Sequence, residues 1–216
     1  YMYVLTENID KVRAEEAQNK AARDLDGFDP GAVTTGLQGD YIQPLAIRAN
    51  QGDCLKITLR NQMEIESGSF HVNGGGMVMS ATGKAASTSN PDTVVEVGQS
   101  TEMEWYIHPQ TQEGVRRFHS YSNARELTVM GLFGALIVEP AGSKYLDPLG
   151  TGQATELKSG WQAIVDNGSG HDFREFVIFY HEVGDEAFRP VNKKGDFLPQ
   201  RDPLTDAYRP GGRALN

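Results

Sequence analysis

The sequence predicts an all-β fold, a sandwich of antiparallel strands with a helical insertion near the N-terminus and a long irregular C-terminal segment. Three observations support this prediction. Between residues 44 and 140, apolar residues recur with a period of two in short runs, as in half-buried strands. Turns rich in Gly, Asn and Asp separate these runs at intervals of about 8–12 residues, a spacing typical of sandwiches and barrels. The single cysteine excludes a disulfide framework within the chain.

The first 40 residues have a different pattern. Residues 1–5, YMYVL, resemble a short strand. Residues 6–25 are rich in Ala, Glu, Lys and Arg, which favours a helix. Apolar positions are sparse in this segment, so we expect a mostly solvated helix inserted before the sandwich. Residues 26–40 have the Gly, Pro, Asp and Thr content of turns.

The sandwich begins where the period changes to two. In the run CLKITL, the residues Cys54, Lys56 and Thr58 alternate with apolar residues, which predicts a strand with one face toward the core. Free cysteines are among the most buried residue types, so we expect the Cys54 thiol to be buried and inert. The Gly-, Ser- and Thr-rich residues 73–92 are expected to form a loop. The predicted strands comprise residues 45–49, 54–59, 68–72, 93–97, 99–107, 114–119 and 132–139.

The chain is long enough for one large domain and part of another. We assign residues 1–145 to the sandwich domain, which ends in the sequence PAGSKYLDP. Residues 146–216 hold one strong strand pattern, 176–180, within a polar linker and Pro- and Gly-rich sequence. Because one strand cannot form a core, we expect a linker and the first strand of an incomplete second domain. Further domains or another chain would complete it, and homo- or hetero-oligomers stay open.

Composition argues against several classes of protein. The chain has 29 acidic and 20 basic residues and a formal charge of -9, whereas nucleic-acid binding needs a clustered positive surface. No apolar run approaches the ~18 residues of a membrane-spanning helix, so we expect no membrane span. The chain opens at Tyr1 without a signal peptide, as a chain whose leader had been removed also would. The motifs of common hydrolases and of phosphate-binding loops are missing from the sequence.

Two of the five histidines are candidate metal ligands. His71 lies at the end of a predicted strand before three glycines, and His119 lies at the end of another, in GVRRFHSYS. Two strand ends can converge at one edge of a sandwich, where both imidazoles reach one ion. Histidine binds copper, zinc, iron and nickel, and two histidines are too few to choose among these metals.

Five segments resemble, in order and spacing, the first cupredoxin domain of multicopper oxidases. They are PLAIRANQGDCLKITLRN, SFHVNG, NPDTVVEVGQSTEMEWYI, EGVRRFHSYS and GLFGALIVEP, and they cover roughly residues 44–140. DFREFVIFYHEV is similar to the first strand of that family's second domain. The resemblance implies a cupredoxin-like Greek-key sandwich, copper as the cofactor, and further cupredoxin domains. It also implies a location in the periplasm, at the cell surface or outside the cell.

The copper ligands depart from the pattern of that family. The resemblance implies two His-x-His motifs, whose four histidines bind a trinuclear copper cluster that reduces dioxygen. Here the motifs read His-Val-Asn and His-Ser-Tyr, so Asn73 and Tyr121 stand in place of the second histidines. A carboxamide is a poor copper ligand, and a tyrosine with a pKa of about 10 must lose its proton to bind well.

The chain also lacks a blue copper site, which needs a Cys thiolate, two His and usually a Met. Cys54 precedes the first histidine motif, which is the wrong place. Three alternatives remain for His71 and His119. They bind one copper ion that another domain completes, they are relics that hydrogen-bond loop backbone, or they belong to an altered cluster with Asn73 or Tyr121 as a ligand.

Two functions therefore stay open. The chain is the N-terminal part of a multicopper-oxidase-like enzyme that couples oxidation of a substrate to dioxygen reduction. Alternatively, it is a cupredoxin-like module that has lost its copper and serves assembly or surface interaction. The sequence assigns no catalytic residue, and it leaves a metal ion, a phenol or no substrate at all as alternatives.

Overall fold

The computed structural model of the 216-residue chain describes residues 1–23, 33–34, 40–73, 77–79, 93–148, 159–182 and 213–215. The predictions for the turns at 26–40, for most of the loop at 73–92 and for the irregular C-terminal segment lie largely outside these residues.

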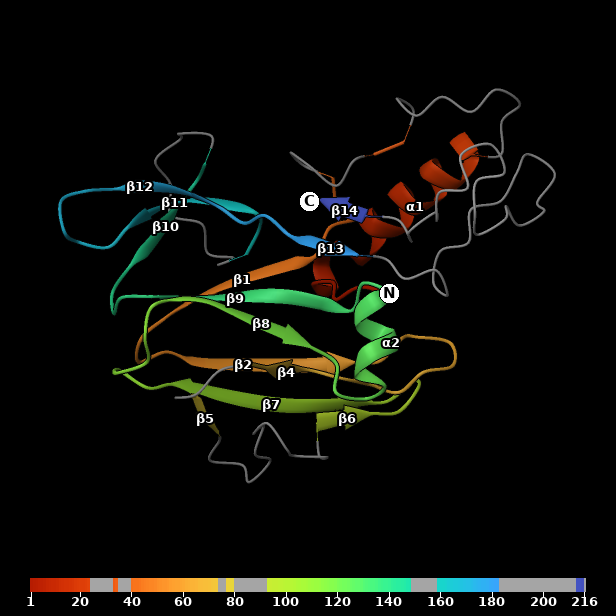
Figure 1. Ribbon diagram of the computed structural model, residues 1–216, viewed down its shortest axis with the longest axis horizontal. Helices are drawn as coiled ribbons and strands as arrows, with labels where there is room; N and C mark the ends of the chain where they lie inside the picture. The colour runs from red at the N-terminus through yellow and green to blue at the C-terminus, as the bar shows by residue number, and fades with distance from the viewer. Residues whose placement is uncertain are drawn as a thin grey trace, which may run out of the picture.

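Two facing sheets form a β-sandwich and lie one above the other in Figure 1. One sheet has the strand order β1-β9-β8-β4 and the other the order β2-β7-β5. β1 and β9 pair in parallel, whereas the remaining pairs within these two sheets are antiparallel. Consecutive strands β1 and β2 lie in different sheets, and this is the cupredoxin-like Greek-key sandwich that the sequence predicted. The strands are β1 (Leu45–Asn50), β2 (Cys54–Arg60), β4 (His71–Val72), β5 (Met77–Met79), β7 (Ser100–Ile107), β8 (Gly114–His119) and β9 (Phe133–Glu139).

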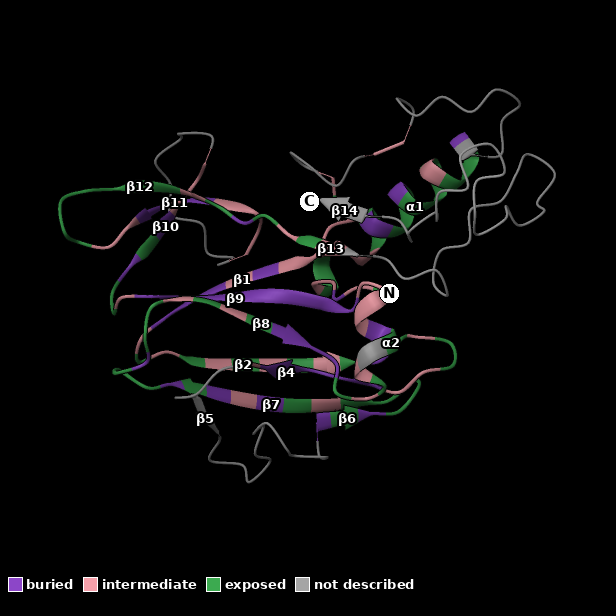
Figure 2. Ribbon diagram, in the orientation of Figure 1, coloured by how far each residue is buried: buried purple, intermediate pink, exposed green. Residues whose placement is uncertain are grey.

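The core lies between the two sheets. Phe70 packs against the rings of both Trp105 and Phe118, and all three side chains are buried. Strand β9 is buried along its whole length (Figure 2), because one face joins this core and the other is covered by Val177 and Phe179. Burial on both faces explains why GLFGALIVEP reads as a continuous apolar run instead of an alternating one.

Strand β2 shows the predicted alternation, but the prediction for its cysteine is wrong. Leu55 and Ile57 pack against the core, whereas Cys54 and Lys56 are exposed. Successive side chains of a strand point to opposite faces, so a cysteine two residues from a solvated lysine shares its face. Lys56 forms an ion pair of 3.1 Å with Glu104 on the neighbouring strand. The outer position of Cys54 therefore follows from the pleat, which outweighs the general tendency of cysteine to be buried.

The single strand predicted over residues 68–72 is two strands in the structure. β3 (Gly68–Ser69) pairs with β6 (Val94–Val95), and β4 pairs with β8 in the first sheet. Phe70, between β3 and β4, is buried in the core, so the chain changes pairing partner at this anchored residue. This change of partner places His71 at the start of β4.

The N-terminal segment confirms the predicted helix and corrects the predicted strand. A short 3-10 helix, η1 (Thr6–Asn8), leads into α1 (Ile9–Arg23). Residues 1–5 pair with no strand among the described residues; instead the Tyr3 ring joins the core and its hydroxyl donates to the Ser69 carbonyl. Within the described ranges, neither α1 nor the short helix α2 (Ala124–Val129), which the sequence did not predict, is long and apolar enough to cross a membrane.

A second, smaller sheet lies beside β1 (Figure 1) and consists of β10 (Lys144–Leu146), β11 (Gln162–Asp166) and β12 (Phe173–Phe176). The interpretation of 149–172 as a polar linker missed β11. Residues 177–179 are not part of a strand, although a strand was predicted there, because Val177 and Phe179 turn onto β9. β13 (Tyr180–Glu182) then pairs with β14 (Arg213–Leu215). The division into 1–145 and 146–216 stays a prediction.

Candidate metal site

The two histidines singled out from the sequence are direct neighbours across a strand pair. His71 on β4 lies opposite His119 on β8 in the antiparallel register, and their ring centroids are 6.0 Å apart. This pairing depends on the split of the 68–72 segment. Strand β3 pairs with β6, whereas β4 pairs with the C-terminal end of β8. The structure thus brings both imidazoles to one place, at one rim of the sandwich.

His71 is buried without a complete set of hydrogen bonds. Only 1% of the residue is exposed, and its Nε2 atom has no hydrogen-bond partner among the described residues. The Trp105 ring packs edge-on against the imidazole at 6.3 Å. Burial, and secondarily the charge of His119, lowers the pKa of His71, so the ring is neutral at neutral pH. An unpartnered buried polar group of this kind costs about 1–3 kcal/mol, which marks this nitrogen as a candidate ligand atom.

His119 differs from His71 because both of its ring nitrogens have neighbours. Nδ1 lies 2.8 Å from the Ser120 carbonyl oxygen, and since a carbonyl only accepts, Nδ1 carries the proton. Burial is the main cause that lowers the pKa of His119, with the Ser120 bond opposing it and the Arg117 charge reinforcing it. In the neutral ring, Nε2 then has a lone pair. This atom lies 3.3 Å from Asn73 Oδ1, and both atoms are acceptors in this tautomer. A hydrogen bond therefore forms only with the Asn73 amide turned so that its NH₂ group faces the ring.

Tyr121 covers the histidine pair from the solvent side. Its ring stacks on His119 at a centroid distance of 5.1 Å and meets the edge of His71 at 4.3 Å. Tyr121 itself is 47% exposed, whereas the two imidazoles are buried. Asn73 and Tyr121, the residues that the sequence resemblance sets in place of the second histidines, therefore lie at the same site. Asn73 contacts one ring nitrogen and Tyr121 shields both rings.

Two buried serines fix this arrangement, and the sequence analysis missed them. The Ser69 amide donates to Ser120 Oγ at 3.1 Å, and the Tyr121 amide donates to Ser69 Oγ at 2.7 Å. Ser120 Oγ in turn donates to the Ser122 carbonyl at 3.0 Å. Each serine is adjacent to the histidine region in sequence, which was the available signal, but serines are common in loops and the signal is weak. The serine bonds hold Tyr121 over the rings.

The donor atoms present here fit part of the coordination of one copper ion. They do not fit the four histidine ligands that the family pattern implies for this domain. Among the described residues, no group of three or more His, Cys, Asp or Glu side chains lies close enough to hold a metal ion. Cys54 is on the exposed face of the other sheet, so it offers no thiolate to the histidine pair. What the site provides is two neutral imidazoles, one with a free buried nitrogen. Two imidazoles can fill two coordination positions of one copper ion, but they are too few for their share of a trinuclear cluster.

A family model described as multicopper oxidase matches residues 24–143, which is more than half of the chain. No curated protein sequence matches the chain significantly.

Several solved structures are similar over part of the chain. A multi-copper oxidase from Pseudomonas thermotolerans is 19% identical over 44% of this chain and 22% of that one, with a TM-score of 0.36. A laccase from Pediococcus acidilactici is 18% identical over 46% and 20%, with a TM-score of 0.37. A copper nitrite reductase from Nitrosomonas europaea is 18% identical over 46% and 31%, with a TM-score of 0.35. The matched part thus spans between a fifth and a third of these chains. Because the family model matches more than half of the chain, the chain belongs to the multicopper oxidase family.

Proposed function

We propose that this chain is the N-terminal part of a multicopper-oxidase-like enzyme in which His71 and His119 bind one copper ion. A further domain or another chain supplies the remaining ligands. The observation that carries the proposal is the buried Nε2 atom of His71, which has no hydrogen-bond partner in the part of the chain that the structure describes and lies beside a second imidazole. A lone pair held away from water is costly without a partner, and a metal ion provides one. The proposed reaction class is oxidation of a substrate coupled to dioxygen reduction.

Each residue of the site has a role in this proposal. Burial keeps His71 neutral near pH 7, and with the ring proton on Nδ1 the Nε2 lone pair is available to a metal ion. His119 becomes a ligand once the Asn73 side chain turns away from Nε2, while the bond from Nδ1 to the Ser120 carbonyl keeps the ring oriented. Tyr121 limits the access of water to both rings. Copper, when bound, supplies the one-electron chemistry.

The proposal includes what lies around this domain. Residues 146–216 are a linker and the beginning of a second cupredoxin-like domain. Further cupredoxin domains or a second chain complete that domain and the copper site. Because family resemblance is the only basis for a compartment, we infer a location outside the cytoplasm, in the periplasm, at the cell surface or in the medium.

One observation favours the alternative function, a cupredoxin-like interaction module without copper. Both ring nitrogens of His119 already have neighbours, the Ser120 carbonyl and the Asn73 amide. In this alternative, His119 is a relic that hydrogen-bonds a loop. The two functions differ in one point. In the enzyme, the Asn73 side chain moves away so that His119 Nε2 binds a metal ion, whereas in the interaction module Asn73 stays in contact with this nitrogen.

Copper binding by the 216-residue chain tests the proposal. The chain is loaded with Cu(II), freed of loose metal by gel filtration, and measured by elemental analysis and electron paramagnetic resonance. We expect about one copper per chain, with nitrogen hyperfine structure from imidazole. The variants His71→Leu and His119→Leu lose it, whereas His108→Leu, which changes an exposed histidine, retains it. Equal copper content in all four proteins, or none in any of them, contradicts the proposal.

A further inference from the structure

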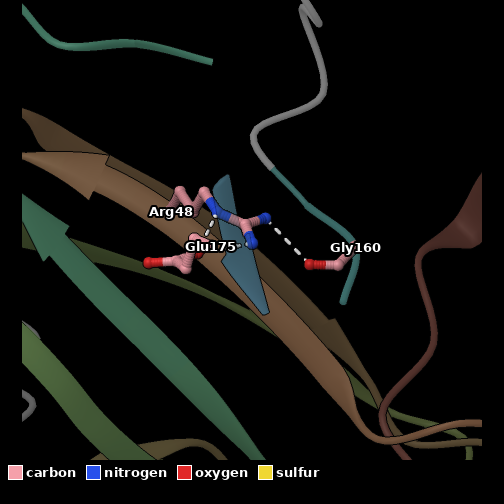
Figure 3. Close-up of polar contacts among 3 residues, drawn as sticks. All are labelled: Arg48, Gly160 and Glu175. Carbon is pink, nitrogen blue, oxygen red and sulfur yellow. Dashed lines mark hydrogen bonds and ion pairs between the residues drawn. The ribbon is translucent and has the colours of Figure 1, made fainter. Parts of the chain in front are cut away.

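A buried arginine joins the sandwich to the β10–β12 sheet. Arg48 on β1 is 1% exposed, and Figure 3 shows its guanidinium group between Glu175 of β12 and the Gly160 carbonyl. Nε donates to Glu175 Oε1 at 2.8 Å, Nη2 forms an ion pair with the same oxygen at 2.6 Å, and Nη1 donates to Gly160 at 2.8 Å. A buried charge needs such partners, so this contact fixes β12 against β1. We call the contact region of Arg48, Glu139, Gly160 and Glu175 the seam.

A second carboxyl group lies in the seam. Glu139, the last residue of β9, is 7% exposed and lies opposite Asn50 of β1 in the parallel register. Asn50 is two residues after Arg48, so the Glu139 side chain shares the face on which Arg48 meets Glu175. Two carboxylates have only acceptor oxygens, so neighbouring carboxyl groups can hydrogen-bond each other only when one of them carries a proton. Arg48 supplies one positive charge for two carboxyl groups, and the shared proton removes the excess negative charge.

The surroundings of Glu139 agree with this assignment. Burial raises the pKa of Glu139 from 4.5 to about 7, followed by the charge of Glu175 and the hydrogen bond to it, and then by the charge of Glu113. Arg48 is the opposing influence. On the remaining side, from β10, the Tyr145 hydroxyl donates to the Asn50 side chain. Burial and the nearby Glu139 raise the pKa of Tyr145, so this group is neutral throughout the relevant pH range.

We propose that Glu139 and Glu175 share one proton that fastens the β10–β12 sheet to the sandwich, and that the seam is tightest in mildly acidic solution and loosens as this proton is lost. The proposal is independent of copper, because neither the seam residues nor their partners belong to the histidine pair. Nothing in the sequence marked these residues as a unit, since Arg48, Glu139 and Glu175 are far apart along the chain.

The pH range follows from the two protonation states. When the sheet separates, Glu139 meets water and its pKa returns toward 4.5, whereas in the closed seam it is about 7. The closed seam therefore holds the proton more tightly. Its stability is complete below about pH 4.5, falls as the pH rises to about 7, and is constant above that value.

Hydrogen exchange of the 216-residue chain tests the proposal. Exchange at the β11 and β12 amides is measured from pH 4.5 to 8 and corrected for the intrinsic pH dependence of amide exchange. The opening equilibrium is expected to rise up to tenfold per pH unit until about pH 7 and then level off. The Glu139→Gln variant, whose amide still donates to Glu175, is expected to lose this rise. The control Glu96→Gln, an exposed site on a turn, is expected to keep it.

A second readout does not depend on a variant. The carboxyl carbon of Glu139, labelled with ¹³C, is expected to titrate near pH 7 in the unaltered chain. Titration near 4.5, a flat exchange profile in the unaltered chain, or an unchanged profile in Glu139→Gln would each overturn the proposal.

Discussion

The histidine pair and the seam are both clusters of buried polar groups, but they differ in the partners that their buried polar atoms have. At the seam, Arg48 Nε and Nη1 donate hydrogen bonds to Glu175 and Gly160. Nη2 has no hydrogen-bond partner among the described residues, but it lies 2.6 Å from a Glu175 carboxylate oxygen in an ion pair. At the histidine pair, the Nε2 atom of His71 has no hydrogen-bond partner within the described ranges. Buried polar groups in proteins are nearly always satisfied. A cluster whose buried charge is compensated by an opposite charge therefore indicates a structural role, whereas an unpartnered neutral nitrogen beside a second imidazole indicates a place for a ligand.

The largest expected effect is the removal of the seam cation. Arg48→Met leaves the buried Glu139 and the partly buried Glu175 side by side without a positive charge, so we expect a loss of about 3–5 kcal/mol in the free energy of unfolding. Denaturant titration at pH 7 measures it. Lys56→Met is the matched control, since it removes the exposed cation of the Lys56–Glu104 pair, and we expect no resolvable change. Comparable losses in both variants would contradict the structural role of the seam.

A smaller effect distinguishes the two histidines in the absence of metal. Replacing His71 by Leu removes an unpartnered nitrogen, so we expect the metal-free chain to gain stability or keep it unchanged. Replacing His119 by Leu leaves the Ser120 carbonyl and the Asn73 amide without their partner, and we expect a loss of about 1–2 kcal/mol. Thermal unfolding in the presence of a chelator measures both. A larger loss for His71→Leu than for His119→Leu would show that His71 has a partner after all.

The third prediction concerns the Tyr121 ring that covers the histidine pair. We expect its removal to change stability least and to be detected by the chemical reactivity of His71. Tyr121→Ala removes a half-exposed ring that packs on both imidazoles. We expect the reaction of His71 with diethyl pyrocarbonate to become several-fold faster, because the reagent reaches the ring only after the cover opens. Mass spectrometry of the modified peptide gives the rate. Tyr106→Ala changes a similarly exposed tyrosine on β7 and is expected to leave the rate unchanged.

The sequence predicted those features that depend on local pattern. The period of two located β1, β2, β7 and β8 to within a residue or two, a continuous apolar run located β9, and the strand ends located the two histidines. The burial of Cys54 was predicted from residue type and is wrong, although its alternation with Lys56 carried the correct answer. The alternation of residues within a strand therefore predicts the face of a side chain better than the average burial of its residue type does.

Features that depend on long-range contacts were not predictable in this way. Arg48 and Glu175 are 127 residues apart, and neither residue type nor spacing indicates that they meet. The missed strand β11 lies in a segment with polar flanks, and it forms because β10 and β12 pair with it on either side. The cover formed by Tyr121 likewise depends on the serines of two separate strand ends. A charged residue inside an apolar run, such as Arg48 in PLAIRAN, is the one sequence signal of the seam.

The most direct test of the proposed function is a crystal structure of the copper-loaded chain with an anomalous map at the copper absorption edge. The proposal predicts a peak within bonding distance of His71 Nε2, with His119 Nε2 as a second ligand and the Asn73 side chain turned away. A map without a peak at this site, in which His119 Nε2 still contacts Asn73, would contradict the proposal and leave the copper-free module as the function of this domain.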